Sequence, residues 1–190
     1  WFLVNTYETW TDRVDTQRYG TQTQVYDLQY FTGRTREVNR RGKATDHWFD
    51  ANGNGTKTVD PVGATWLHEY NDHLERTQTT LPRGNTLHWT FDDQDEDRLA
   101  QGNLLEFRRK DQGLGSLSDI VWAYTYESHF QFVKTVVSPR NYTTTFGYDW
   151  EQQGGANHGN VVSIAYPSIN AGQPSTQTIT VTMAWNSAGQ

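Results

Sequence analysis

Apolar residues in this chain come in short aromatic- and threonine-rich runs that turn-forming segments separate. The run 64–70 is long enough for one strand, and so is the run 142–148. Asn and Gly, which tolerate positive φ at little cost, fill 51–55, and Thr and Val then predict a strand over 56–59. No helical pattern of useful length competes. The pattern therefore predicts antiparallel strands joined by short turns.

These runs recur with a period of 21 residues, which separates the acid or amide positions 50, 71 and 92 and also the glycines 42, 63 and 84. Each repeat carries an aromatic residue followed by a carboxylate or its amide. The pairs are Tyr26-Asp27, Phe49-Asp50, Tyr70-Asn71, Phe91-Asp92, Tyr126-Glu127, Tyr148-Asp149 and Trp185-Asn186. An eighth pair, Tyr7-Glu8, has no support from its surroundings. We expect strands to end at these pairs.

A proline turn accompanies the pairs. It is complete at Pro61 with Gly63 and at Pro82 with Gly84, and Pro139 continues the series. Each proline lies 10 residues before the next acid or amide. Because proline presets φ for a turn and cannot donate to a central ladder, each repeat is predicted to be two strands with two turns. A fixed period of this kind marks one supersecondary unit used repeatedly.

The predicted fold is all-β, with repeated antiparallel hairpins of about 21 residues forming a continuous twisted or spiralling sheet. We expect one repeat array over 1–190, with 1–23 strand-like but unassigned and repeats over 24–190. Turn insertions are expected near 93–101, 113–119 and 150–158. The last pair, Trp185-Asn186, begins a copy of the residue pattern of 49–54, so the chain is expected to be part of a longer one.

The sequence of residues 48–63 resembles the YD repeat of the Rhs family. The sequences of residues 124–141 and 146–149 resemble it as well. The resemblance implies a long sheet of hairpins that spirals into a hollow shell. Members include shell-forming components of insecticidal toxin complexes, polymorphic toxins, wall-associated proteins and teneurins. In the toxins the shell encloses a C-terminal effector, which an aspartate-based self-cleavage segment frees. That segment has no match here, so the resemblance assigns no catalytic residue.

Several repeats depart from the family pattern. Asn replaces the acid at 71 and 186, Arg40 stands where proline is expected, and Asn141 replaces the glycine. These changes keep the hairpin but name no subfamily.

Charge and composition narrow the possible partners. The formal net charge is -6, which leaves no basic face for a nucleic acid. No apolar run approaches the length of a membrane helix, no targeting signal is visible, and the absence of cysteine excludes disulfides. We expect a secreted or bacterial cell-surface protein without cofactor or metal. Its expected partners are the remainder of a longer chain or neighbouring protomers at the sheet edges, and an enclosed toxin domain or surface glycans.

Paired carboxylates can flank a glycosidic bond, so the four acids Asp50, Asp92, Glu127 and Asp149 are candidates for acid and base roles. They occur once per repeat at a turn, however, and a periodic arrangement does not suit a site that must separate two pKa values. The chain is therefore predicted to be a non-catalytic structural segment that encloses a cargo or acts as an extracellular scaffold.

Three weaker patterns remain as alternatives. Acids alternate over 93–97 as in a calcium loop, but Arg98 occupies the glycine place, so a solvated loop is favoured. His47 and His68 share one repeat position without metal-ligand spacing. Indole rings could stack on sugars in a carbohydrate-binding or adhesive module, although packing is favoured for most of them. The indoles are Trp48, Trp66, Trp89, Trp122 and Trp150.

Overall fold

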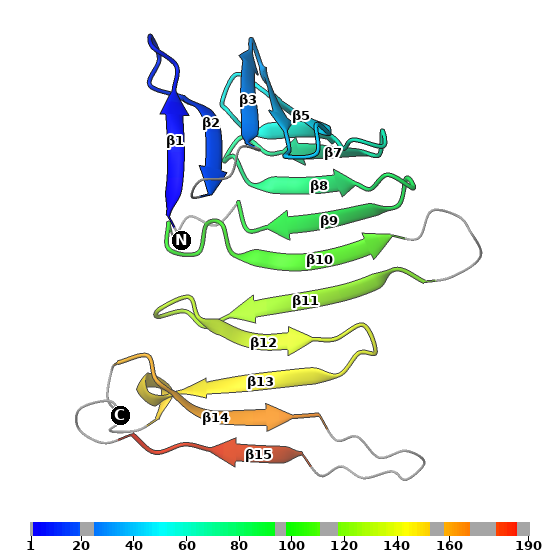
Figure 1. Ribbon diagram of the computed structural model, residues 1–190. Coiled ribbons are helices and arrows are strands. Elements are labelled where there is room, and N and C mark those ends of the chain that lie inside the picture. The colour runs from blue at the N-terminus through cyan, green and yellow to red at the C-terminus, as the bar shows by residue number, and fades with distance from the viewer. Residues whose placement is uncertain are drawn as a thin grey trace. The chain divides into compact units, whose positions relative to one another are not determined.

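The computed structural model describes residues 2–19, 25–93, 98–110, 118–152, 158–167 and 178–185. In these ranges the strands β1 to β15 are hydrogen-bonded in the order of the sequence, and neighbouring strands are antiparallel from β1 to β8 and from β10 to β15 (Figure 1). The described part contains no α-helix and one 3-10 turn, η1 at Asp149–Glu151. The prediction of an all-β chain of repeated antiparallel hairpins is confirmed.

Contacts divide the chain into two compact units, Trp1–Thr86 and Leu87–Gln190, and each is described by itself. The strands of the first unit are β1 Leu3–Tyr7, β2 Val14–Tyr19, β3 Tyr26–Phe31, β4 Arg34–Val38, β5 Ala44–Phe49, β6 Gly55–Val59, β7 Thr65–Tyr70 and β8 Arg76–Thr80. The unit boundary falls after the first residue of β9, Thr86–Phe91. The second unit continues with β10 Leu104–Lys110, β11 Ile120–Tyr126, β12 Val133–Val137, β13 Thr143–Tyr148, β14 Val161–Tyr166 and β15 Ile179–Thr182.

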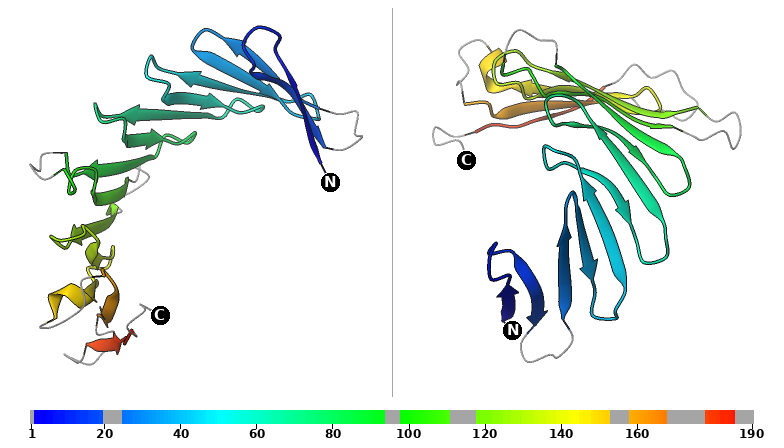
Figure 2. Two further views of the ribbon diagram at one scale, coloured as in Figure 1. Left: turned by 90° about the vertical axis from the view of Figure 1, so that its left-hand side faces the viewer. Right: turned by 90° about the horizontal axis from the view of Figure 1, so that it is seen from above.

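Within each unit the strands form a single layer, as Figure 2 shows. No described element covers either face of the sheet, so few side chains are fully buried. The residues classed as buried in the described ranges are Thr79, Ala100, Glu127, Tyr148 and Asp149. Two of these five are carboxylates. The best-buried groups therefore lie at strand ends and loops rather than in a central apolar core.

In the second unit, large and small side chains lie on opposite faces of the sheet. Phe107 lies opposite Trp122, and Phe146 opposite Ile164, so large apolar groups share one face. The alternate positions carry small residues, because side chains point to opposite faces along a strand. Thr125, Thr135 and Thr145 form one such cross-strand row. This alternation explains why hydrophobic content as low as 34% supports a sheet.

Strands end at five of the predicted aromatic-acid pairs, which are Phe49-Asp50, Tyr70-Asn71, Phe91-Asp92, Tyr126-Glu127 and Tyr148-Asp149. The prediction is wrong for Tyr26-Asp27, which begins β3 and pairs with β2 through Gln17 and Thr16. β3 ends instead at Phe31, in a tight turn where Gly33 has φ +67°. Such a short turn needs no acid to close it.

A β-bulge precedes the aromatic residue of several pairs. The strand register shifts immediately before Tyr7, Phe49, Tyr70, Tyr126 and Tyr148. In each case one extra residue of the following strand is skipped, for example Thr56 opposite the step from Trp48 to Phe49. A bulge re-aims the side chain beside it, so the repeat places its aromatic residue by the same device each time.

Candidate functional site

The acid or amide after a strand closes its own loop. Oδ1 of Asp50 accepts the backbone N–H of Asn52 at 2.9 Å and of Asn54 at 2.8 Å. The N–H of Asp50 donates to the Asn54 carbonyl at 3.0 Å, which completes a five-residue loop. Asn71 makes the same pair of side-chain bonds two and four residues ahead, at 3.1 and 2.9 Å. The side chain thus satisfies backbone donors that the strand ladder leaves free.

The loops at the opposite ends of the strands are closed in the same way, which the sequence pattern did not predict. Oδ1 of Asp60, directly before Pro61, accepts N–H groups two and four residues ahead at 2.9 and 2.8 Å. Asn39, before Arg40, does the same at 2.9 and 3.1 Å. At Asp60, Asn39 and Ser138 the signal was present in the sequence as a short polar residue immediately before the proline or its replacement, whereas Leu81 precedes Pro82. Asp50 and Asp60 therefore close the successive loops at the two ends of β6.

Glu127 closes a longer loop with a longer side chain. Its N–H donates to the carbonyl of Phe132 at 2.9 Å, which makes a six-residue loop. Its carboxylate accepts three backbone N–H groups, from His129 at 2.7 Å, Phe130 at 2.8 Å and Phe132 at 2.9 Å. Glu127 is 4% exposed. One extra methylene thus accompanies one extra loop residue.

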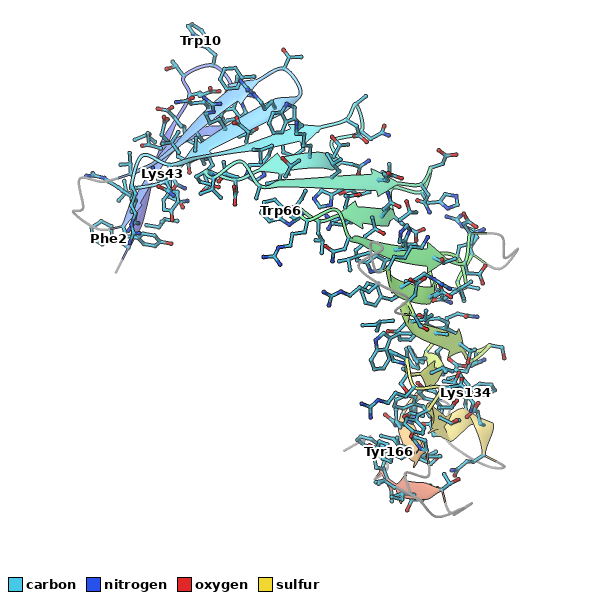
Figure 3. All side chains as sticks on the ribbon, turned by 90° about the vertical axis from the view of Figure 1, so that its right-hand side faces the viewer. Phe2, Trp10, Lys43, Trp66, Lys134 and Tyr166 are labelled. Atoms are coloured by element: carbon cyan, nitrogen blue, oxygen red, sulfur yellow. The ribbon has the colours of Figure 1, made fainter. Side chains whose placement is uncertain are left out.

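Tyr7-Glu8 makes the same six-residue backbone closure, although its surroundings in the sequence gave it no support. β1 ends at Tyr7 after a bulge, and the Glu8 N–H donates to the Arg13 carbonyl at 2.8 Å. The Glu8 carboxylate bonds Thr11 and the Arg13 side chain, the latter at 3.0 Å. Trp10 at the tip of this loop is 94% exposed and points away from the strands (Figure 3).

Two much longer loops are closed at their bases by the same backbone bond. The Asp92 N–H donates to the Asn103 carbonyl at 2.8 Å, and the Asp149 N–H to the Asn160 carbonyl at 2.9 Å. Asp149 also accepts the N–H of Gly159 at 3.1 Å. The calcium-like positions 94–97, most of the predicted insertion 113–119, and Asn186 lie outside the described residues.

Loop closure requires one residue with positive φ, placed just before the carbonyl that closes the loop. Glycine fills this position in six of the closed loops, and Asp12, Leu74, Gln131 and Asn141 fill it in four others. Glycine adopts this conformation without steric cost, whereas Cβ makes it unfavourable in other residues.

Leu74→Gly is expected to stabilise the chain by about 1 kcal/mol, because φ at this position is +67° and Leu74 is 51% exposed, so little burial is lost. Urea unfolding followed by tryptophan fluorescence measures the change. Val62→Gly is the matched control, since Val62 is an exposed loop residue outside the positive-φ set. It should leave stability unchanged or lower it. Equal effects of the two changes would contradict the backbone explanation.

Aromatic side chains with a polar hydrogen form hydrogen bonds to the strand before their own. In the described ranges, four tyrosine hydroxyls donate to the carbonyl of the first residue of the preceding strand. They are Tyr70 to Gly55 at 3.1 Å, Tyr126 to Leu104 at 2.9 Å, Tyr148 to Val133 at 2.7 Å and, without a bulge or a following acid, Tyr30 to Val14 at 2.8 Å. The indole Nε1 of Trp185 donates to the Val161 carbonyl at 2.8 Å in the same manner. In the pairs that begin with Tyr70, Tyr126 and Tyr148, the phenol thus ties two strands together, while the following acid or amide closes the loop.

The pKa shifts agree with structural use of these groups. The Asn54 side chain and backbone N–H groups hold the pKa of Asp50 below its ordinary value. Burial raises the pKa of Asp149, but N–H groups including those of His158 and Gly159 outweigh it, and the net shift is downward. A general acid near neutral pH needs a raised carboxyl pKa, which neither group has.

Burial raises the pKa of the Tyr148 phenol, and the nearby Glu127 and Glu151 raise it further. Oε1 of Glu151 accepts Lys134 Nζ at 2.6 Å, beside η1 (Figure 3). The raised pKa keeps the phenol protonated as a hydrogen-bond donor. Burial raises the pKa of Glu151, but Lys134 and the Tyr148 N–H outweigh it, so the net shift is downward and the Glu151 carboxylate is held ionised as their acceptor.

The first two candidate indoles lie on opposite faces of the sheet. Trp48 pairs with Lys57, whose Nζ lies 4.6 Å from the indole centroid, while Trp66 pairs with Thr58 on the alternate face. The Arg34 guanidinium also lies 5.9 Å from the Trp48 ring. Cations of the chain itself therefore occupy positions beside Trp48 that a stacked ligand would need.

The other two indoles flank one phenylalanine. The Trp89 and Phe107 ring centroids are 5.5 Å apart, and Phe107 lies directly opposite Trp122. Trp150 is not part of this row, since its ring lies 5.2 Å from His129. Trp89, Phe107 and Trp122 thus form a half-buried aromatic row on one face of the second unit.

The paired histidines make cross-strand bonds to threonine. His47 Nδ1 lies 3.3 Å from Thr58 Oγ1, and His68 Nδ1 lies 2.9 Å from Thr79 Oγ1. Burial lowers the pKa of His68, and the charge of Arg76 lowers it further. The described residues hold no cluster of His, Asp or Glu that could bind a metal ion. In the same ranges, no helix has the length and apolarity needed to cross a membrane.

Together these features define a class of protein, a single-layer antiparallel array whose hairpins are closed by side-chain-capped loops. No protein-family model and no curated protein matches the chain. Among solved structures, the crystal structure of TcdB2-TccC3 without its hypervariable C-terminal region has a TM-score of 0.64 to this chain at 16% identity. The match covers 96% of this chain and 10% of that chain.

The similarity to TcdB2-TccC3 shows a shared fold, and it agrees with the resemblance to the Rhs/YD-repeat family. Two other matches are too distant to support an argument. A porin-like protein from Bacteroides uniformis has a TM-score of 0.39 at 14% identity, covering 94% of this chain and 88% of that one. TcdB2-TccC3-Cdc42 has a TM-score of 0.32 at 9% identity, covering 99% and 15%.

Proposed function

We propose that this chain is a non-catalytic structural segment of a longer secreted or surface-displayed protein of the Rhs/YD-repeat kind. Its hairpins form part of a wall that encloses or carries a toxin cargo, or that serves as an extracellular scaffold. The observation that carries the proposal is the use of the periodic carboxylates as loop closures. Oxygens of Asp50, Glu127 and Asp149 accept backbone N–H groups of their own loops.

Catalysis would need at least one carboxyl group able to exchange a proton with a substrate near neutral pH. Asp50 and Asp149 have lowered pKa values instead. The proposal would be abandoned if the chain hydrolysed a glycoside and Asp149→Asn, in a chain that still folds, stopped the turnover.

The shared fold supports a role within a larger object. This chain matches 10% of the TcdB2-TccC3 chain, so the TcdB2-TccC3 chain is many times longer than this one. A single-layer sheet also gains little burial by itself, and the described residues include no fully buried large side chain. Such an array depends on neighbours along the sheet for stability.

The outermost strand β15 provides the test of that dependence. All of its residues are exposed, with Ile179 at 62% and Val181 at 46%, and it pairs with β14 alone among the described strands. Unpaired edges accept further strands. The 190-residue chain is therefore expected to associate beyond its monomer mass of 21.9 kDa as its concentration rises. Multi-angle light scattering measures this.

Val181→Lys should reduce the association, because a charge on an edge strand opposes pairing. Val62→Lys is the control, since Val62 is 88% exposed in a turn and should leave association unchanged. A wild-type chain that stays monomeric at every concentration tested would contradict edge pairing.

A carbohydrate-binding or adhesive surface is the second candidate. The row of Trp89, Phe107 and Trp122 favours it, because adjacent rings on one face suit stacking on sugars. Titration of the chain with D-glucose, D-galactose and N-acetyl-D-glucosamine, followed by backbone NMR shifts, tests it. Saturable shifts that Trp122→Ala abolishes are expected, and shifts that survive this change would contradict binding on the row.

A further inference from the structure

Loops of opposite charge lie at the two ends of the strands in the first unit. Because consecutive strands are antiparallel, the loops after β1, β3, β5 and β7 lie at one end of the strands, and those after β4, β6 and β8 lie at the other. Figure 3 labels one residue at each end, Trp10 in the loop after β1 and Lys43 in the loop after β4. The unit therefore has two edges that are rows of loops.

The loops after the odd-numbered strands form the acidic edge, which comprises residues 8–13, 32–33, 50–54 and 71–75. Five carboxylates and one cation give this edge a formal net charge of -4. The carboxylates are Glu8, Asp12, Asp50, Asp72 and Glu75, and the cation is Arg13. Asp12, Asp50 and Asp72 are exposed, so this edge presents negative charge to the solvent.

The loops after the even-numbered strands form the basic edge, which comprises residues 39–43, 60–64 and 81–85. Four cations and one acid give this edge a formal net charge of +3. The cations are Arg40, Arg41, Lys43 and Arg83, and the acid is Asp60. Because the whole chain has a net charge of -6, its composition alone does not produce a positive edge. The two signs of charge are separated by position.

The exposed charges of the two edges have no role in holding their own loops. The side chains of Arg41, Lys43 and Arg83 are exposed and form no hydrogen bond or ion pair with any residue in the described ranges. The same holds for the carboxylates of Asp12 and Asp72. These groups differ in this respect from the loop-closing carboxylates, so their charge is available to a partner.

The two edges also have the same spacing. Each carries one loop for every two strands, and neighbouring strands lie about 4.8 Å apart, so successive loops on either edge are about 10 Å apart. A row of cations on one copy can therefore face a row of carboxylates on another copy in register. Opposite charges attract across such a contact within the Debye length, which is about 8 Å at physiological ionic strength.

We propose that the basic edge docks on the acidic edge of a second copy of this chain. The loop 39–43 faces the loop 71–75, because these loops carry the largest unpaired charge of their edges. This contact goes beyond the proposed wall function, since it joins two sheets side by side, whereas pairing at β15 extends a single sheet. Two different edges meet in it, so each bound copy keeps one edge free to add another copy.

Sedimentation velocity of the 190-residue chain at low and high salt tests the proposal. The chain carries Val181→Lys throughout, so that strand pairing at β15 does not contribute. We expect association with a Kd on the order of 100 μM at low ionic strength. Raising NaCl from about 20 to about 500 mM should weaken it about tenfold or more, because salt screens the contact. A monomer in both salts, or association that salt leaves unchanged, would overturn the proposal without touching the wall function.

Reversing two charges of the basic edge tests its part in the contact. Arg41→Glu combined with Lys43→Glu should weaken self-association about tenfold or more, because like charges then face each other. This variant keeps its acidic edge, so a fluorescently labelled sample should still bind the unreversed chain. Failure to bind it would show that two different edges do not meet. Lys57→Glu, in the middle of β6, is the control and should leave association unchanged.

Carbodiimide cross-linking of mixed ¹⁴N- and ¹⁵N-labelled chains locates the contact, because it joins a lysine amine to a carboxylate that touches it. Amide links between Lys43 of one copy and Asp72 or Glu75 of another are expected at low salt. Links between copies that involve only Lys57, Lys110 or Lys134 would refute the assigned edges. Binding of the chain to phosphatidylglycerol vesicles without any link between copies would overturn the proposal in favour of a membrane surface.

Discussion

Replacing Glu127 by alanine is expected to lower the free energy of unfolding of the second unit by about 3 kcal/mol or more. Three backbone N–H groups, those of His129, Phe130 and Phe132, lose their acceptor together. Each buried donor left without a partner costs roughly 1 to 3 kcal/mol, and Glu127 is only 4% exposed. Urea unfolding measures the total loss, and hydrogen exchange of the three amides locates it.

Glu127→Asp separates side-chain reach from charge. Aspartate keeps the carboxylate but is one methylene shorter, so in a six-residue loop it should restore only part of the stability. Asp72→Ala is the control, because Asp72 is an exposed acid in a loop of the first unit and its loss should change stability by no more than about 0.5 kcal/mol. Unchanged exchange of the three amides in Glu127→Ala would show that the carboxylate does not hold this loop.

The hairpins were predictable because their signal is local. A strand of five to seven residues followed by an acid or amide and a turn can be read from adjacent positions, and β5, β7 and β13 end where the pairs predict. The period strengthened each weak motif, since the same spacing recurred at 50, 71 and 92. The structural role favoured for the carboxylates agrees with the bonds that Asp50 and Glu127 make.

Where prediction failed, the motif had been drawn too narrowly. The structure shows that the common element is a backbone closure with a positive-φ residue just before the closing carbonyl, with or without an aromatic neighbour. Most of these loops add an acceptor side chain, whereas Leu81 closes its loop without one. Asp60 and Asn39 meet that description without an aromatic residue before them, and they close loops. Tyr26-Asp27 has the aromatic residue but no turn after it, and it lies inside the sheet.

Other features depend on pairing between strands and were out of reach of a sequence pattern. A bulge exists only as a mismatch between two strands, so Thr56 gives no sign of it by itself. The Arg40 guanidinium lies 4.5 Å from the Tyr19 ring centroid, a contact between the loop after β4 and β2 that no local pattern indicates. Local rules thus specify the hairpin, whereas register decides which side chains meet.

Gly159→Ala is expected to destabilise the second unit by about 2 to 4 kcal/mol, through two effects that a control can separate. Gly159 has φ +75°, a conformation that costs alanine about 1 to 2 kcal/mol. An alanine Cβ would also lie 2.6 Å from Cε2 of Phe132 and 3.4 Å from Cδ2 of Phe130. The Phe132 ring is 43% exposed, so relief of this contact requires it to turn toward solvent and away from Phe130 and Tyr148, whose ring centroids lie 5.4 and 5.6 Å from its own.

Gly63→Ala isolates the backbone effect, since Gly63 has φ +87° and no atom within 4 Å of the added Cβ. It should cost only about 1 kcal/mol, so the difference between the two variants measures the packing of Gly159 against the phenylalanines. Restoring space with Gly159→Ala combined with Phe132→Leu should recover part of that difference. If the two glycine variants lose the same stability, the aromatic cluster does not constrain the long loop that Asp149 closes, and its role in holding that loop is disproved.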